Sequence, residues 1–389
     1  MNSLDQGYNR SRLVVSLFFF LQGLNFATWA SRIPDIKQAL SLSEAELGGV
    51  LFAMPIGQIC AMALSAWVVK RFESINTLAV AALLCPLFLL PLGVATTPFA
   101  LCVALFLYGA VTNLYNISIN TQGVDVERIY SKNIMATFHG VWSLGGFLGG
   151  VLSMVFVAID LPTFQHFSIV CVGSIIVAIL FRKGFVPQDV RPETATTNDD
   201  EAVKIPFWRR FDSYILLLGV MSFGAMICQG AMYDWSGVYF SDVVNAPDNL
   251  VRLGYIVCMS TMTMGRFLSD GMKSRFGTVT VVRASGLLIA FGIMIAVISP
   301  TLIFATLGLF FVGFGISSTV PICYSLAGKS ATLSPSVALA AVSTIGYLGF
   351  LVGPPVIGFI AHAISLRWTF AVIAIIGLSI TFLASRLKD

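Results

Sequence analysis

The residues of this chain that could do chemistry are polar side chains set within long apolar stretches. The stretch at residues 98–120 carries Asn113, Asn116 and Asn120, whose spacing of three and four positions places three amides on one face of a helix. Amides both donate and accept hydrogen bonds, so this face suits a ligand that bears hydroxyl groups. Hydrogen bonding between helices is the alternative use of the same side chains.

Asp234 is the acidic residue that lies within an apolar stretch and away from the predicted inner side. A carboxylate there is costly, and its functional use would be to carry a proton or to accept a hydrogen bond from a substrate hydroxyl. The alternative is an ion pair near the outer interface with Arg32 or Arg252. His139 is a second candidate for proton coupling because imidazole titrates near neutral pH, and its alternative is a hydrogen bond on the inner side.

Further amide and aromatic side chains are candidates for the lining of a binding cavity, where rings stack on a solute and amides orient it. Their spacing places several of them on common helix faces. For a tryptophan in this set, a place in the aromatic belt at the membrane interface is an equally good interpretation. These candidates are Asn25, Trp29, Gln58, Trp142, Gln229, Tyr233 and Tyr324.

The apolar stretches that must position these side chains are long enough to cross a membrane. Hydrophobic residues make up 57% of the 389 residues and charged residues 11%, whereas a soluble globular domain carries roughly 25% charge. Each stretch holds about 20 residues or more, and none shows the alternation of a β-barrel strand. The sequence therefore predicts an all-α membrane protein with twelve transmembrane helices, at residues 12–31, 45–69, 75–95, 98–120, 134–158, 163–182, 211–240, 250–271, 279–299, 301–324, 334–362 and 366–386.

Lysine and arginine residues are distributed very unevenly about these spans. Of the 23, one (Arg266) lies well inside a span, four lie at or beyond the span ends on one side, and the other 18 lie at or beyond the span ends on the opposite side. Because cytoplasmic loops retain basic residues, the four mark the outer side, and both termini are predicted to be cytoplasmic, in a bacterial inner membrane. The four outer residues are Arg32, Lys37, Arg252 and Arg367.

A polar segment divides the chain into two halves of six spans. We predict an N-terminal half at residues 1–182, a cytoplasmic linker at residues 183–210 and a C-terminal half at residues 211–389. Arg71-Phe72 recurs as Arg275-Phe276, 204 positions later, and the glycine-rich segment 145–150 is similar to segment 353–358. Parallel repeats of this kind place a site between the two halves in many secondary transporters.

Several segments resemble those of a known family. Residues 265–270, followed by Arg275-Phe276-Gly277, look like the loop signature of the major facilitator superfamily. Segments 29–37, 116–123, 139–145 and 229–235 are similar to its fucose-permease-like branch, in particular to a bacterial group that includes rhizopine-type transport proteins. The resemblance covers nearly the whole chain. It implies the major facilitator fold of two pseudo-symmetric six-helix halves.

The resemblance also implies roles for charged residues, with departures. Related proteins hold the inner gate shut with a charge latch, which here would involve Arg71, Arg266, Asp270 and Arg275. They also carry acidic residues where this chain has Ala30, Asn116 and Gln229, so proton coupling by the usual route is in doubt.

These observations together favour a secondary transporter. We expect it to move a small polar solute such as a sugar or a polyol by alternating access, as a monomer among membrane lipids, with proton symport left open. A drug or metabolite exporter of the same superfamily is the first alternative, and a non-transporting membrane receptor or sensor is the second. Neither a nucleotide-binding motif nor a basic aromatic patch for nucleic acid occurs in the sequence. No catalytic constellation and no metal or cofactor motif is found either, which argues against an enzyme.

Overall fold

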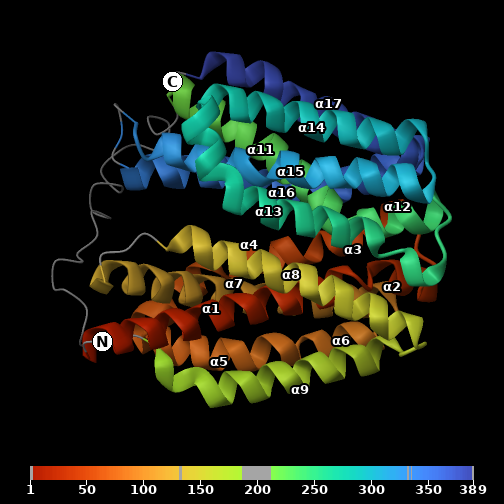
Figure 1. Ribbon diagram of the computed structural model, residues 1–389. Helices are drawn as coiled ribbons and strands as arrows, with labels where there is room; N and C mark the ends of the chain where they lie inside the picture. The colour runs from red at the N-terminus through yellow and green to blue at the C-terminus, as the bar shows by residue number, and fades with distance from the viewer. Residues whose placement is uncertain (1–2, 131–133, 186–211, 331–332, 334, 388–389) are drawn as a thin grey trace. The chain divides into compact units, whose positions relative to one another are not determined.

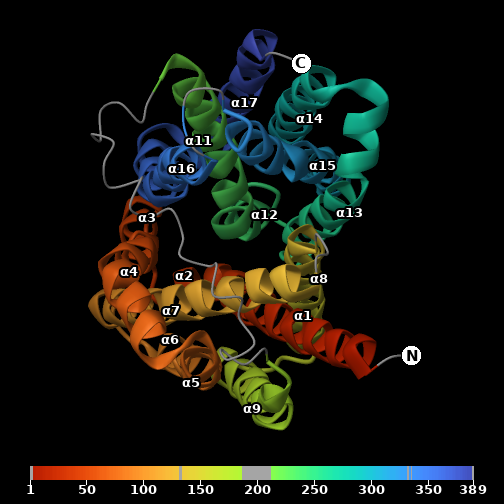
Figure 2. The same cartoon turned by 90° about the vertical axis from the view of Figure 1, so that its left-hand side faces the viewer.

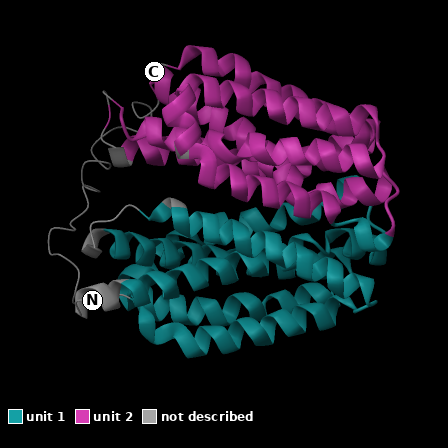
Figure 3. Ribbon diagram, viewed as in Figure 1, with its two compact units in different colours: residues 1–192, 248–252 teal, residues 193–247, 253–389 magenta. Residues whose placement is uncertain are grey.

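The computed structural model describes residues 3–130, 134–185, 212–330, 333 and 335–387, and within these ranges all regular structure is helical (Figure 1). The chain forms two compact units (Figure 3). Unit 1 comprises residues 1–192 together with Asp248–Arg252, and unit 2 comprises residues 193–247 and 253–389. Each predicted half thus supplies most of one unit, but five residues of the C-terminal half belong to unit 1.

Unit 1 is built from long helices that run side by side, with short helices at their ends. Figure 2 shows α4 beside α7, and α1 beside α8, as their contacts also require. The helices are α1 (Ser3–Ala30), α2 (Ile33–Ala39), α3 (Glu44–Leu51), α4 (Ala53–Phe72), α5 (Ser74–Leu87), α6 (Leu89–Val94), α7 (Pro98–Tyr130), α8 (Met135–Ala158), α9 (Thr163–Phe181), the 3-10 helix η1 (Arg182–Gly184) and the 3-10 helix η4 (Asp248–Leu250).

In its described residues, unit 2 repeats this arrangement with six long helices, one short α-helix and one 3-10 helix. Its main pairs are α11 with α16, α13 with α15, and α14 with both α15 and α17. The helices are α11 (Ser213–Asp234), α12 (Ser236–Asp242), α13 (Leu253–Phe276), α14 (Thr278–Ile298), α15 (Leu302–Ala327), α16 (Pro335–Ile364), α17 (Leu366–Leu383) and the 3-10 helix η5 (Ala384–Arg386).

Eleven helical segments of the described chain are long and apolar enough to cross a membrane. They correspond to eleven of the twelve predicted spans. The predicted eighth span is present as α13, which has 24 residues and is not among the eleven. It carries four charged residues, Arg266, Asp270, Lys273 and Arg275. The all-helical fold predicted from the sequence is confirmed, and α13 is its most polar long helix.

The observed helices differ from the predicted spans mainly at their ends. The first ends at Ala30, and a turn leads into α2, where Pro34 occupies the first turn and its missing N–H is no loss. The second begins with α3, whose Ser43 and Glu46 form a reciprocal capping box. The fourth is longer than predicted, because α7 has 33 residues and continues to Tyr130. The turn between α1 and α2 places the polar residue Arg32 at the end of an apolar helix.

Glycine permits close helix contact at equivalent places in the two units. In unit 1, a Cβ on Gly145 of α8 would lie 2.2 Å from the carbonyl oxygen of Phe20 in α1. In unit 2, a Cβ on Gly349 of α16 would lie 2.3 Å from the carbonyl oxygen of Phe223 in α11. The two glycines are 204 positions apart, the same offset as the sequence repeat. Only glycine allows backbones to approach so closely, so both units use the same packing device.

The predicted linker at residues 183–210 lies largely outside the described residues, as does the run of acidic and polar residues within it. Its boundaries therefore stay a prediction. The same holds for the predicted cytoplasmic position of the two termini.

Candidate functional site

The amide face of unit 1 lies on α7 and consists of Asn113, Asn116 and Asn120. The Asn120 side-chain N–H donates to the backbone oxygen of Asn116 at 2.8 Å and to its side-chain oxygen at 3.0 Å. Asn116 is exposed, and Asn120 is partly exposed. The side-chain oxygen of Asn113 is buried and accepts no hydrogen bond. The predicted spacing therefore does bring the amides of Asn116 and Asn120 into contact. The side-chain oxygen of Asn113 remains able to accept a hydrogen bond.

The first helix contributes side chains that are more deeply buried. Asn25 is 1% exposed and donates to the Leu21 carbonyl at 2.7 Å and to the Ser174 hydroxyl of α9 at 3.3 Å. Its side-chain oxygen is buried without a partner. Trp29 is also buried, so the lipid-interface interpretation of this residue is not supported. Asn25 thus serves helix packing with its N–H and keeps an acceptor for another use.

Two further candidates in unit 1 are only partly buried. Gln58 lies midway along α4, and Trp142 lies on α8, where its ring is 5.9 Å from that of Phe26. His139 is exposed on the first turns of α8, and its ring meets that of Phe19 edge-on at 5.3 Å. An exposed imidazole in an aromatic contact is compatible with either interpretation offered by the sequence.

In unit 2, a cluster of polar and aromatic side chains joins α11 and α13. The Gln229 side-chain N–H donates to the Tyr233 hydroxyl at 2.7 Å, and that hydroxyl contacts the sulfur of Met262 at 3.7 Å. Arg266 also hydrogen-bonds to Tyr233. We call Gln229, Tyr233, Asp234, Tyr255 and Arg266 the α11 cluster. The contact between Arg266 and Tyr233 was not predicted from the sequence.

Asp234 is the last residue of α11 and is 8% exposed. It lies close enough to Tyr255 of α13 for electrostatic interaction. The Tyr255 hydroxyl is buried without a hydrogen-bond partner, and so is the indole N–H of Trp235. Buried polar groups are nearly always paired in proteins. The unpaired hydroxyl of Tyr255, beside a buried carboxylate, marks a place where a further polar molecule could form hydrogen bonds.

The remaining candidates are Tyr324 and the residues of the predicted charge latch. Tyr324 of α15 hydrogen-bonds to Ser343 of α16, which accounts for its hydroxyl within unit 2. Arg71 and Arg275 are exposed, and each guanidinium lies over the next residue's ring, at 5.8 Å from that of Phe72 and 5.3 Å from that of Phe276. The Asp270 side chain lies outside what the structure describes. The latch predicted for Arg71, Arg266, Asp270 and Arg275 stays a prediction.

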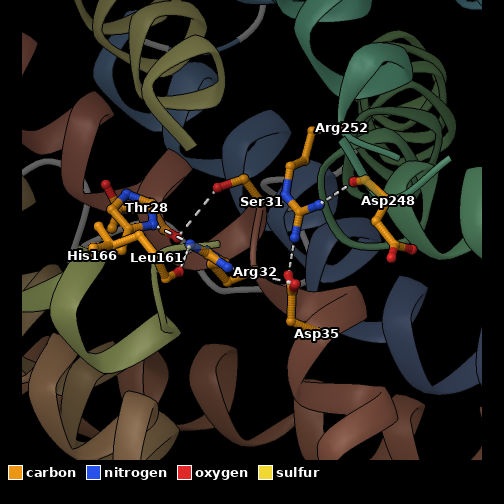
Figure 4. A network of polar contacts seen from close by, with 8 residues as sticks. All are labelled: Thr28, Ser31, Arg32, Asp35, Leu161, His166, Asp248 and Arg252. Atoms are coloured by element: carbon orange, nitrogen blue, oxygen red, sulfur yellow. Dashed lines mark hydrogen bonds and ion pairs between the residues drawn. The ribbon is translucent and has the colours of Figure 1, made fainter. Parts of the chain in front are cut away.

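A network of buried charges that the sequence analysis missed lies in unit 1 (Figure 4). Asp35 of α2 pairs with Arg32 at 3.5 Å and also with Arg252, which lies just before α13. Arg32 is 4% exposed and Arg252 is 2% exposed. The ion pair proposed between Asp234 and one of these arginines is not the one that forms, because Asp35 occupies both. The signal was present in the spacing of Arg32 and Asp35, three positions apart on one turn.

Arg32 connects this network to the sixth long helix. Its Nε donates to Nδ1 of His166 in α9 at 3.1 Å, and its Nη2 donates to the Leu161 carbonyl at 2.8 Å. His166 is fully buried, with its ring 5.0 Å from that of Phe156. We call Arg32, Asp35, His166 and Arg252 the outer network. In the described part of the chain, no group of three His, Cys, Asp or Glu side chains could hold a metal ion.

Comparison of the sequence with known proteins gives consistent results. The family model of the Major Facilitator Superfamily matches residues 15–337. An uncharacterized MFS-type transporter of Yersinia pestis is 30% identical over 366 residues, which cover 94% of this chain and 92% of that protein. The membrane protein MosC of Rhizobium meliloti is 32% identical over 352 residues, covering 90% of this chain and 84% of MosC.

Comparison with solved structures also finds transporters, as the comparison of sequences does. The crystal structure of the nucleoside transporter NupG matches with a TM-score of 0.75 and 15% identity, covering 97% of this chain and 99% of that one. A bacterial homologue of the human lysosomal transporter Spinster, in an inward-facing and unoccupied conformation, matches with a TM-score of 0.73 and 16% identity, covering 98% of this chain and 97% of that one. At these identities the likeness concerns the fold.

Proposed function

We propose a class of solute for this chain, which belongs to the Major Facilitator Superfamily and is thus a secondary transporter in the membrane. The solute is small, polar and rich in hydroxyl groups, such as a sugar or a polyol. We propose further that it moves by alternating access between the two halves. The family consists of transporters and not of enzymes. The bacterial relatives support a bacterial membrane, which we take to be the inner membrane.

The observation that carries this proposal is the exposure of Asn116 within a membrane-spanning helix. The apolar segment of α7 extends over Pro98–Glu127, and Asn116 lies well inside it. An amide that faced hydrocarbon would cost roughly 2–7 kcal/mol. Asn116 and Asn120 therefore support a path that contains water or solute, and their donors and acceptors suit hydroxyl groups.

The α11 cluster supports the same class of solute from unit 2. Gln229, Tyr233 and Arg266 form a continuous set of hydrogen-bonding groups. The unpaired hydroxyl of Tyr255 adds another group beside Asp234. Rings with a few fixed polar groups are the usual lining of a sugar-type cavity. NupG, which shares the fold, is a nucleoside transporter, and a nucleoside also carries hydroxyl groups on a ring.

Proton coupling is proposed through Asp234 rather than through His139. Asp234 is almost fully buried and lies next to a phenol without a partner, whereas His139 is exposed. An intramembrane carboxylate is costly unless it has a use. Symport with a proton would give it one.

The direct test is thermal stability of the purified protein against sugars, polyols, amino sugars and lipophilic cations, because a ligand that binds the folded state stabilises it. We expect stabilisation by a hydroxyl-rich compound, and Asn116→Ala should weaken its binding about tenfold. Asn76→Ala is the matched control, since Asn76 is an exposed amide of unit 1 whose side-chain N–H donates to the Phe72 carbonyl. Stabilisation by lipophilic cations alone would contradict the proposal and support an exporter.

A further inference from the structure

Asn120 of α7 makes two hydrogen bonds that together fix how its own amide is turned. Its Nδ2 atom lies 2.8 Å from the backbone oxygen of Asn116 and 3.0 Å from the side-chain oxygen of the same residue. A backbone carbonyl can only accept a hydrogen bond. The end of the Asn120 amide that faces this carbonyl must therefore be its NH2 group.

The orientation of Asn120 in turn fixes that of Asn116. The NH2 group of Asn120 offers only donors, so the atom of the Asn116 amide that it contacts at 3.0 Å must be the oxygen. The opposite orientation of Asn116 would set two NH2 groups against each other with no acceptor between them. One backbone carbonyl thus determines the orientation of both side chains.

The consequence is that Asn116 directs its NH2 group away from Asn120. Asn116 is exposed, and its side-chain oxygen is already engaged by Asn120. The group that it presents to its surroundings is therefore NH2, with two N–H donors. Because the apolar segment of α7 extends over Pro98–Glu127 and hydrocarbon offers no acceptor, these donors need an acceptor from water or a solute.

Asn76 of α5 shows the same backbone bond without a second amide. Its side-chain N–H donates to the carbonyl of Phe72, four positions earlier, at 3.1 Å, as that of Asn120 does to Asn116. The earlier residue is here a phenylalanine, whose side chain carries no amide. The bond from asparagine to a backbone carbonyl is a common local contact, so the link between two side chains is the added feature of α7.

We propose that Asn120 is a positioning residue, which turns the amide of Asn116 so that α7 presents hydrogen-bond donors to the solute. The solute group that meets Asn116 is then an oxygen that accepts, such as a hydroxyl, ring or carbonyl oxygen. A protonated amine carries only donors, and at this point it would leave both partners unpaired. The inference rests on the solute contact at Asn116 proposed above, and it adds the direction of the hydrogen bond.

The first experiment measures exchange of asparagine side-chain N–H groups with water, by NMR of the full-length protein that carries isotope-labelled asparagine, without any solute. Asn116→Leu removes the side-chain acceptor and keeps the backbone carbonyl. Exchange of the Asn120 amide should then become about fivefold faster, which corresponds to one net hydrogen bond. Phe72→Leu is the matched control and should leave exchange of Asn76 unchanged, because that amide donates to the backbone carbonyl of residue 72.

A substitution that reverses the bonding of Asn120 tests the orientation of Asn116 directly. Asn120→Asp removes the donors and leaves acceptors, so the NH2 group of Asn116 should turn to the carboxylate and its exchange should slow about tenfold. Asn76→Asp is the control and should leave Asn116 unchanged. If Asn120→Asp does not fold, Asn120→Leu releases Asn116 instead, and the resonances of the Asn116 amide should shift. An Asn116 amide that no substitution of Asn120 affects would overturn the proposal.

The second experiment determines which kind of solute group meets Asn116. The probes are pairs of sugars in which one hydroxyl is replaced by an ammonium group, glucose with glucosamine and galactose with galactosamine, and the readout is stabilisation of the folded protein at increasing concentration. We expect the hydroxyl member to bind about tenfold more tightly. Asn120→Leu should bring the ratio close to one, whereas Asn76→Leu should preserve it.

The outcomes separate the positioning role from the transport function. Equal binding of both members of each pair to the unsubstituted protein would contradict the proposed direction of the hydrogen bond, and so would a ratio that Asn120→Leu leaves intact. Binding of none of the sugars would count against the proposed function. The exchange measurements need no solute, so they decide the orientation of Asn116 in either case.

Discussion

The outer network of unit 1 and the α11 cluster of unit 2 both bury polar and charged groups, but they complete their hydrogen bonds differently. Asp35 has two arginines, and Arg32 has a carboxylate, an imidazole and a carbonyl as partners. In the α11 cluster, the carboxylate of Asp234 lies beside a phenol whose hydroxyl has no hydrogen-bond partner. The charges of the outer network are paired within the protein, although Nε2 of His166 and Nε of Arg252 have no hydrogen-bond partner. The α11 cluster instead holds a buried carboxylate beside an unpaired hydroxyl.

The difference shows how a buried charge should be interpreted. A charge that is paired internally contributes to folding, and its removal leaves the partner uncompensated. A charge that lacks a full set of partners costs stability and is kept for an interaction with something outside the chain. Mutations of the outer network should therefore reduce stability, and mutations of the α11 cluster should reduce transport.

The largest expected effect is that of Arg32→Gln. The substitution removes the hydrogen bonds to His166 and Leu161 and half of the pairing of Asp35, and we expect the free energy of unfolding to fall by about 3 kcal/mol. The measurement is chemical or thermal unfolding of the purified protein in detergent. Arg367→Gln is the control, because this partly exposed arginine donates to the carbonyls of Val297 and Ile298 and lies over the Trp368 ring, without an ion pair among the described residues. Equal losses in the two variants would remove the distinction between the network and an ordinary arginine.

The next effect tests whether the two units tolerate the same change. Gly145→Ala and Gly349→Ala each place a methyl group against a backbone carbonyl of the neighbouring helix, at 2.2 Å and 2.3 Å. We expect each to lower the free energy of unfolding by about 2 kcal/mol, since backbones must shift to admit the group. Gly173→Ala is the control, because a Cβ there meets nothing within 4 Å. A neutral result in one unit would show that its helix pair can separate where the other cannot.

Much of the fold was predictable, because a membrane helix needs a long apolar stretch wherever it occurs. All eleven helical segments that meet the length and hydropathy criteria were predicted as spans. Helix interruptions such as the one before α2 were not predicted, since a short turn leaves the apolar pattern almost unchanged. The length of α7 was also underestimated, because its last turns are polar and resemble a loop in sequence.

The candidate site was less predictable, for a physical reason. Spacing along one helix correctly brought together Asn116 with Asn120 and Gln229 with Tyr233. Contacts between distant segments, such as Arg252 with Asp35 or Arg266 with Tyr233, depend on how helices pack. A single sequence carries no direct signal for such pairs. The transport roles of these residues stay predictions.

A third prediction concerns Asp234 of the α11 cluster. Asp234→Asn keeps the shape of the side chain and removes its charge, so we expect proton-driven uptake to fall about tenfold while solute affinity stays nearly the same. Uptake into proteoliposomes with and without a proton gradient is the measurement. Asp160→Asn is the control, because Asp160 is exposed in the turn before α9 at a positive φ of 55°, which asparagine also tolerates. An unaltered response to the gradient would remove Asp234 from any proton path.

The smallest expected effects are those of removing one tyrosine hydroxyl in unit 2, either in the α11 cluster (Tyr233) or at a packing contact (Tyr239). Tyr233→Phe removes the hydroxyl that accepts from Gln229, and Tyr239→Phe removes one that donates to the Ala296 carbonyl at 2.9 Å. Each loss is worth about 1 kcal/mol, or roughly a fivefold change. We expect it to appear as weaker solute binding for Tyr233 and as lower stability for Tyr239, when the two are compared by ligand-dependent and ligand-free thermal unfolding. If Tyr233→Phe behaved like Tyr239→Phe, the α11 cluster would be packing in the same sense as the outer network, and the site would have to be sought on the amide face of α7.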